Sequence, residues 1–179
     1  MSYFDLIINI TEAFICTLFV YKLFNRKFST YLIASLFYSG VITACNFTSS
    51  PEIIMIVLSI LILFSYSHFL NKANYLQNIF IALFINTLVN VATTLSICFS
   101  TLLAKFPIDS VDGYHLMAMI SKPILLVLVL ATASHIKKYY FLESQVLKYI
   151  TISIVLLNFI YSVTAVSYTH LTLPTILLV

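Results

Sequence analysis

Residues 4–24, FDLIINITEAFICTLFVYKLF, form an apolar block that is long enough to cross a lipid bilayer as one helix. A membrane-spanning helix needs roughly 17–25 predominantly apolar residues. Glu12 lies well inside this block, and an ionisable group at membrane depth is costly unless it faces protein or water. The stretch therefore predicts a transmembrane helix that directs one face toward other helices.

Five further apolar blocks follow, so the sequence predicts an all-α, polytopic transmembrane helix bundle of about six spans. Charged residues make up only 8% of the chain, whereas about a quarter of a soluble domain is charged, so a soluble fold is excluded. The separators are short, which favours antiparallel neighbours in one bundle. The five blocks are Tyr31–Phe47, Ile53–Leu70, Ile79–Ala104, Met117–Ile136 and Tyr149–Ala165.

Basic residues gather at alternate separators, and Lys and Arg favour the cytoplasmic side of a membrane. The basic separators hold Lys22, Arg26 and Lys27, then Lys72, then Lys137, Lys138 and Lys148. The other two hold Glu52 alone, and Lys105 with Asp109 and Asp112. This alternation predicts that the N-terminus lies outside. Richness in Ile, Asn, Lys, Phe and Tyr is typical of an AT-rich bacterial genome, so the expected location is the bacterial cytoplasmic membrane.

The first span carries polar residues at helical spacing. Asp5, Asn9, Glu12 and Cys16 share one helix face. That face either packs through interhelical hydrogen bonds, or contacts a ligand or transmits a signal. Lys122, a few residues into the fifth block, either snorkels to the outer interface or pairs with Glu12. The depths of the two side chains are compatible with a pair that fixes the register of spans one and five.

The fourth span is the most polar. One stripe along it comprises Asn86, Asn90, Thr93 and Ile97, and a neighbouring stripe comprises Thr87, Thr94 and Thr101. Amide and hydroxyl side chains hydrogen-bond across helices in membranes. The stripes therefore indicate either helix packing or a lined binding cavity. The candidate ligand or packing residues of the whole chain are Asn9, Glu12, Asn86, Asn90 and Lys122.

Other chemistries find no support in the sequence. The three cysteines form no C-x-x-C pair, and His68, His115 and His135 have no partner at metal-ligand spacing, so no metal site is expected. Two glycines cannot build a nucleotide-binding loop, and they argue against glycine packing as the main contact between helices. A formal charge of +3 is too small to indicate nucleic-acid binding. No catalytic residue and no cofactor are assigned to this chain.

Three segments carry a resemblance to a known family. LIINITEAF at residues 6–14 resembles an opening helix with its Asn and Glu, and LFNRK at residues 23–27 resembles a first basic cytoplasmic turn. ISK at residues 120–122 heads an apolar helix that ends in two lysines. As a pattern over nearly all of residues 1–165, this resembles the N-terminal membrane region of peptide-sensing histidine kinases from Gram-positive bacteria. These are similar to the accessory-gene-regulator receptor and carry a C-terminal GHKL-type ATPase domain.

The resemblance implies a sensor that binds an extracellular peptide in a cavity open to the outside. It also implies a homodimer, a response regulator as partner, and ATP with Mg²⁺ bound only by a kinase domain that residues 1–165 do not contain. The alternative is a multi-pass membrane protein of unassigned function, such as a transporter or scaffold subunit. A membrane protein that processes signal peptides is a further alternative, and it would need a His and a Cys side by side near the cytoplasmic face.

The last residues have a different expected origin. Residues 166–179 resemble a translated sequencing adaptor, because SYTHLTLPT at residues 167–175 matches the reading of a transposon-end adaptor used in shotgun libraries. Residues 1–165 are therefore expected to be an incomplete transmembrane bundle. With the N-terminus outside, six spans return the chain to the outside, one span short of a cytoplasmic domain.

Overall fold

The computed structural model describes residues 3–24, 27–48, 51–72, 75–104, 111–139 and 149–158, and each of these segments is helical. The long helices are α1 (Tyr3–Phe24), α2 (Phe28–Phe47), α3 (Glu52–Leu70), α4 (Tyr75–Ala104) and α5 (Val111–Tyr139). A shorter apolar helix covers Tyr149–Asn158. The described segments contain no strand, so the predicted all-α class is confirmed.

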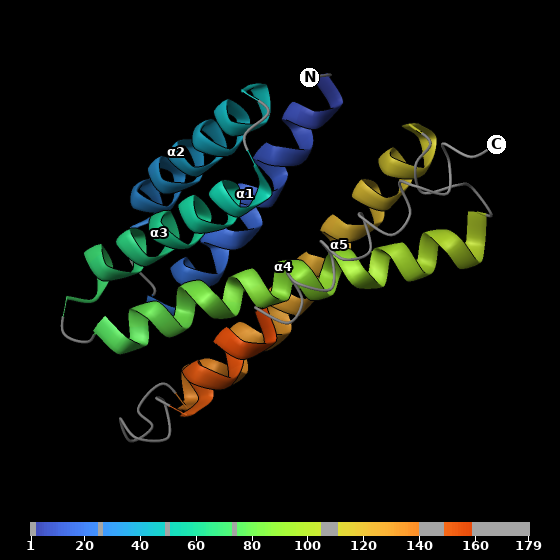
Figure 1. The fold of residues 1–179 in the computed structure, drawn as a ribbon. Helices are drawn as coiled ribbons and strands as arrows, with labels where there is room; N and C mark the ends of the chain where they lie inside the picture. The colour runs from blue at the N-terminus through green and yellow to red at the C-terminus, as the bar shows by residue number, and fades with distance from the viewer. Residues whose placement is uncertain are drawn as a thin grey trace.

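Helix α1 is the central element of the bundle (Figure 1). Each long helix contacts the next in chain order, and α1 also contacts α5, so the five helices close a ring. In addition, α1 contacts α3 and α4. The polar face of the first span therefore meets protein on several sides.

The distribution of apolar side chains is that of a membrane protein. All five long helices are long and apolar enough to cross a bilayer. The most apolar span, in α3, has only 17% of its residues buried, whereas the more polar span of α1 has 44% buried. A soluble bundle would bury its most apolar helix, but lipid solvates apolar side chains and rejects polar ones. The chain is therefore a multi-pass membrane protein.

The hydrophobic core includes buried residues of all five long helices. Ala13, Cys16 and Phe19 of α1 are fully buried, and they belong to one cluster with Ile85 of α4 and Val129 of α5. Small side chains such as alanine let helix backbones approach closely within a membrane. Gly40 does not serve this purpose, because it is exposed and a Cβ atom there would meet nothing within 4 Å.

The predicted span ends agree best for the first three helices. Helix α4 begins at Tyr75 rather than Ile79, and α5 begins at Val111 rather than Met117. The physical reason is that an apolar block marks only the part of a helix that lipid surrounds, whereas the helix itself continues into more polar sequence. Of the predicted sixth span, Tyr149–Asn158 is helical, and 159–165 and the adaptor-like residues 166–179 lie outside the described residues.

Side-chain contacts fix the relative directions of the helices. Phe4 contacts His115, and Glu12 contacts Lys122, so the positions along α1 and α5 increase together and the two helices run parallel. Between α1 and α2, Asn9 meets Asn46 and Thr17 meets Ser35, so these helices run antiparallel. The parallel pair α1 and α5 and the antiparallel pair α1 and α2 are both expected if successive spans cross the membrane in opposite directions.

Cysteine labelling tests the orientation predicted from the basic separators. Thr48 and Lys72 are both exposed, and they follow α2 and α3 at opposite ends of the bundle. In a background with Cys16→Ala, Cys45→Ala and Cys98→Ala, a membrane-impermeant maleimide should label Thr48→Cys in intact cells. It should label Lys72→Cys only after the cells are permeabilised. The reverse pattern would show that the N-terminus lies inside, and the cysteine-free parent measures the background.

Candidate functional site

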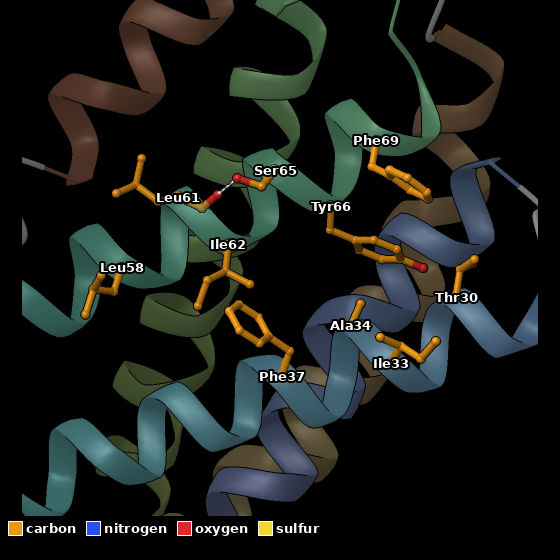
Figure 2. A pocket seen from close by; sticks show the side chains of 10 residues that line it. All are labelled: Thr30, Ile33, Ala34, Phe37, Leu58, Leu61, Ile62, Ser65, Tyr66 and Phe69. Atoms are coloured by element: carbon orange, nitrogen blue, oxygen red, sulfur yellow. Dashed lines mark hydrogen bonds between the residues drawn. The ribbon is translucent and has the colours of Figure 1, made fainter.

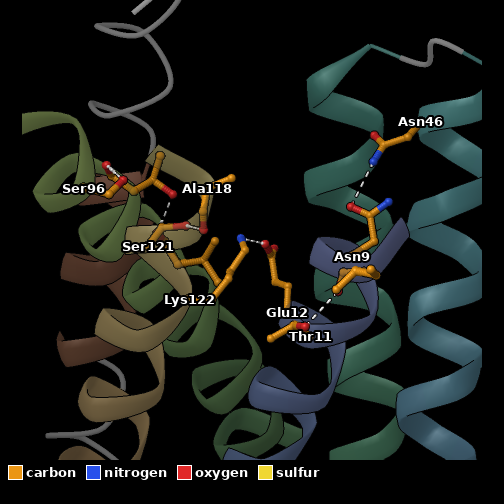
Figure 3. A network of polar contacts seen from close by, with 11 residues as sticks. Asn9, Thr11, Glu12, Asn46, Ser96, Ala118, Ser121 and Lys122 are labelled. Atoms are coloured by element: carbon orange, nitrogen blue, oxygen red, sulfur yellow. Dashed lines mark hydrogen bonds and ion pairs between the residues drawn. The ribbon is translucent and has the colours of Figure 1, made fainter. Parts of the chain in front are cut away.

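An ion pair joins the first and fifth helices within the membrane. The Nζ atom of Lys122 on α5 donates to Oε2 of Glu12 on α1 (Figure 3). The Lys122 side chain is 14% exposed and that of Glu12 is 22% exposed, so both charges lie largely within protein. The predicted pair is therefore present. Lys122 points toward α1. Snorkelling would require its side chain to point toward the outer interface instead.

The turn of α5 that carries Lys122 has an unusual backbone. Pro123 lies inside α5, and it has no N–H to donate to the carbonyl of Met119. One residue before Lys122, the Ser121 hydroxyl donates to the carbonyl of Ala118 at 2.9 Å. The helix continues through this turn, and Lys122 projects from it toward Glu12 (Figure 3).

The pair fixes how α1 and α5 sit against each other. Two opposite charges attract far more strongly in a medium of low dielectric constant than in water. Removing one partner leaves the other charge without compensation, and for fully buried pairs this costs about 3–5 kcal/mol. The partial exposure of both side chains reduces that cost here. The pair therefore favours one register of α1 on α5 over the alternatives.

Asn9 extends the polar face of α1 toward α2. Nδ2 of Asn46 donates to Oδ1 of Asn9 at 3.2 Å, and Asn9 is only 7% exposed. Nδ2 of Asn9 is buried and has no hydrogen-bond partner among the described residues. Oγ1 of Thr43, one turn before Asn46 on α2, is also buried and without a partner there. Because α1 and α2 run antiparallel, Thr43 lies at the level of Glu12.

The rest of the predicted α1 face also points into protein. Cys16 is fully buried in the core, and Asp5 is half-buried near the start of the helix. Thr17, the residue after Cys16, contacts α2: its hydroxyl lies 2.6 Å from that of Ser35, and both side chains are fully buried. Helix α1 thus makes polar contacts with α2 through Asn9 and Thr17, and with α5 through Glu12.

A second polar cluster involves the predicted stripe on α4. Nδ2 of Asn86 and Nδ2 of Asn90 donate to the same atom, Oδ1 of Asn158, at 3.0 and 2.9 Å. Asn158 in turn donates to Oγ1 of Thr87 at 2.8 Å. Asn86 and Asn90 are thus used for packing between α4 and the helix 149–158. Two other threonines of these stripes form hydrogen bonds within α4. Thr93 donates to the carbonyl of Val89, and Thr94 donates to the carbonyl of Asn90.

Sequence reasoning did not single out Asn158. It is the one amide in the predicted sixth span, so it produces no stripe of its own. The signal that could have identified it is its isolation, because a lone amide in an apolar span needs a partner on another helix. The polar stripe on α4 offered the matching donors.

Two of the histidines, His68 and His115, contact aromatic rings. His68 stacks on Phe64 and Tyr75, and its Nδ1 lies 3.3 Å from Nδ2 of Asn78. Asn78 also accepts from Ser67 at 2.6 Å, so this group ties the end of α3 to the start of α4. In the described part of the chain, no three His, Cys, Asp or Glu side chains lie close enough together to hold a metal ion.

Comparison with known proteins adds no relative. No family model matches the chain, and no curated protein or solved structure matches it either. The candidate site is therefore defined by its own geometry: the ion pair of Glu12 and Lys122 between α1 and α5, and the buried amide of Asn9 on the side of α1 that faces α2.

Replacing one charge of the pair should destabilise the bundle more than replacing both. Glu12→Gln or Lys122→Met should each cost about 1–3 kcal/mol, because the remaining charge stays within low-dielectric surroundings. The double variant should cost less than the sum of the two single variants. Denaturant unfolding of the chain in detergent micelles measures all three free energies. Lys22→Met, an exposed lysine on α1, is the control and should change the free energy of unfolding little. Additive costs would show that the two charges do not interact.

Asn158→Leu should destabilise the contact between α4 and the helix 149–158 by about 1–2 kcal/mol, since several interhelical hydrogen bonds are lost at once. Ser153→Ala is the matched control on the same helix, because the Ser153 hydroxyl is exposed and bonds only the carbonyl of Tyr149. Thermal unfolding in micelles compares the two variants. Equal stability of Asn158→Leu and Ser153→Ala would contradict a packing role for the cluster.

Proposed function

We propose that this bundle is the membrane sensor region of a signal-transduction histidine kinase that detects an extracellular peptide. The observation that carries the proposal is the ion pair of Glu12 and Lys122 within the membrane. Ionisable residues inside a membrane are rare, and they commonly mark substrate paths, relays or ligand sites. The resemblance of residues 1–165 to the sensor regions of such kinases supports the same function.

The pair and the groups beside it suit the recognition of a peptide. Peptide bonds carry carbonyl oxygens, and Nδ2 of Asn9 is a buried donor without a partner in the described part of the chain. A charged group on the ligand would compete for Glu12 or Lys122 and weaken their contact. In this proposal, binding from the outside changes the register of α1 on α5.

Helix α1 is placed to pass such a change on, since it contacts all four other long helices. A ligand shifts a conformational equilibrium only by its difference in affinity for the two states. An ion pair that forms in one register and opens in another supplies such a difference. The expected output is a homodimeric kinase domain that follows this region, binds ATP and Mg²⁺, and acts on a response regulator.

The native gene and a reporter strain test the proposal together. Sequence read downstream of the Ala165 codon should encode another apolar span, a helix with a phosphoacceptor histidine, and a GHKL-type ATP site. The complete gene should then drive a two-component reporter in response to culture supernatant of the source bacterium. Protease treatment of that supernatant should abolish the response.

Glu12→Gln should reduce the ratio of stimulated to unstimulated signal at least several-fold at equal protein level, because no ion pair is left for the ligand to open. Lys22→Met is again the matched control and should respond like the native protein. A stop codon soon after position 165 would exclude the kinase. A response that survives protease treatment would exclude the peptide.

A further inference from the structure

A groove between α2 and α3 lies away from the ion pair. Its volume is about 410 Å³, and its lining is almost entirely apolar (Figure 2). The lining side chains include Ile33, Ala34, Phe37, Leu61, Tyr66 and Phe69. Ile33, Phe37, Leu61 and Phe69 are exposed, so the groove opens sideways to the surroundings of the bundle, which in a membrane are hydrocarbon.

The groove contains one polar group that lacks a partner. Tyr66 is only 8% exposed, and its hydroxyl is buried with no hydrogen-bond partner among the described residues. Figure 2 shows this hydroxyl directed along the groove toward Thr30 of α2. Thr30 donates to the carbonyl of Lys27 at 2.7 Å, and Ser65 donates to that of Leu61 at 2.7 Å. Both of these hydroxyl protons are used within their own helices, so neither Thr30 nor Ser65 donates to the Tyr66 hydroxyl.

The length of the groove matches one leaflet of a bilayer. On α3 the lining runs from Leu58 to Phe69, which is about 16 Å at a helical rise of about 1.5 Å per residue. The hydrocarbon core of a bilayer is about 30 Å thick, so each leaflet contributes about half of that. A groove of this length accommodates an acyl chain of one leaflet.

The end of the groove that holds the Tyr66 hydroxyl is also its basic end. Lys27 precedes α2, three residues before Thr30, and Lys72 follows α3, three residues after Phe69. Both lysines are exposed. Basic pockets between transmembrane helices at the cytoplasmic face bind anionic lipid head groups. The charge at this end therefore complements an anionic phospholipid of the inner leaflet.

We propose that the groove between α2 and α3 binds an anionic glycerophospholipid. The acyl chain lies along Ala34, Phe37 and Leu61, and an ester carbonyl accepts the hydrogen bond of the Tyr66 hydroxyl. The phosphate lies near Lys27 and Lys72. This site is separate from the proposed peptide site, which lies between α1, α2 and α5 nearer the other end of the bundle.

Photo-crosslinking of the full chain in nanodiscs tests this site. The probe is phosphatidylglycerol with a diazirine in its acyl chain, and the control lipid is phosphatidylcholine with the same chain. Mass spectrometry should place phosphatidylglycerol adducts on the groove residues of α2 and α3, with a weaker yield for phosphatidylcholine. Tyr66→Phe should lower the yield roughly five-fold, the effect of losing about one hydrogen bond. Tyr149→Phe alters an exposed tyrosine away from the groove and should leave the yield unchanged.

Two further variants sharpen the result. Ala34→Phe fills the groove and should abolish its labelling while the Glu12–Lys122 contact and the fold remain. Lys27→Gln with Lys72→Gln should bring the phosphatidylglycerol yield down to that of phosphatidylcholine. The proposal is overturned if Tyr66→Phe labels like the native chain, or if both lipids label the groove equally. It is also overturned if nanodiscs that hold one copy of the chain label the groove and nanodiscs that hold two copies do not, which would make a second copy the occupant.

Discussion

Hydrocarbon supplies no hydrogen-bond partner, so polar groups within the membrane must be satisfied by protein. This constraint accounts for how the helices of the bundle are paired. Glu12 meets Lys122 across α1 and α5, Thr17 meets Ser35 across α1 and α2, and Asn158 meets the amides of α4. Apolar packing has little preference for one register in lipid, because lipid chains solvate apolar side chains as well as protein does. The directional polar contacts therefore favour one register where they occur, which is between α1 and α5, between α1 and α2, and between α4 and the helix 149–158.

The five helices do not share this task equally. Helix α1 carries polar contacts to two neighbours and is the most central element, whereas α3 is the most apolar span and the least buried. At the end of α3, Ser67 and His68 make polar contacts with Asn78 of α4. The groove opens between α2 and α3, and its lining is almost entirely apolar.

Much of this arrangement could be predicted from the sequence. Features that depend on the local composition of one helix were predictable, and features that depend on the distance between two helices were not. Span existence follows from local composition, so α1 to α5 were all predicted. The Glu12–Lys122 pair was predictable because opposite charges at matching depth in one bundle have few other partners. Asn158 was missed because a single amide forms no periodic stripe. The groove beside Tyr66 depends on the distance between two helices, and no local pattern in either helix encodes that distance.

Some buried polar groups of the bundle have hydrogen-bond partners in the described segments, and others do not. Asn86 and Asn90 each donate an amide N–H to Asn158, so these two side chains are engaged in packing between helices. Nδ2 of Asn9 and the Tyr66 hydroxyl differ, because each is a buried donor that folding of the described segments leaves unmatched. An unmatched buried donor costs about 1–3 kcal/mol. A bound acceptor would recover that cost at Asn9 or Tyr66, as it would at the buried hydroxyl of Thr43.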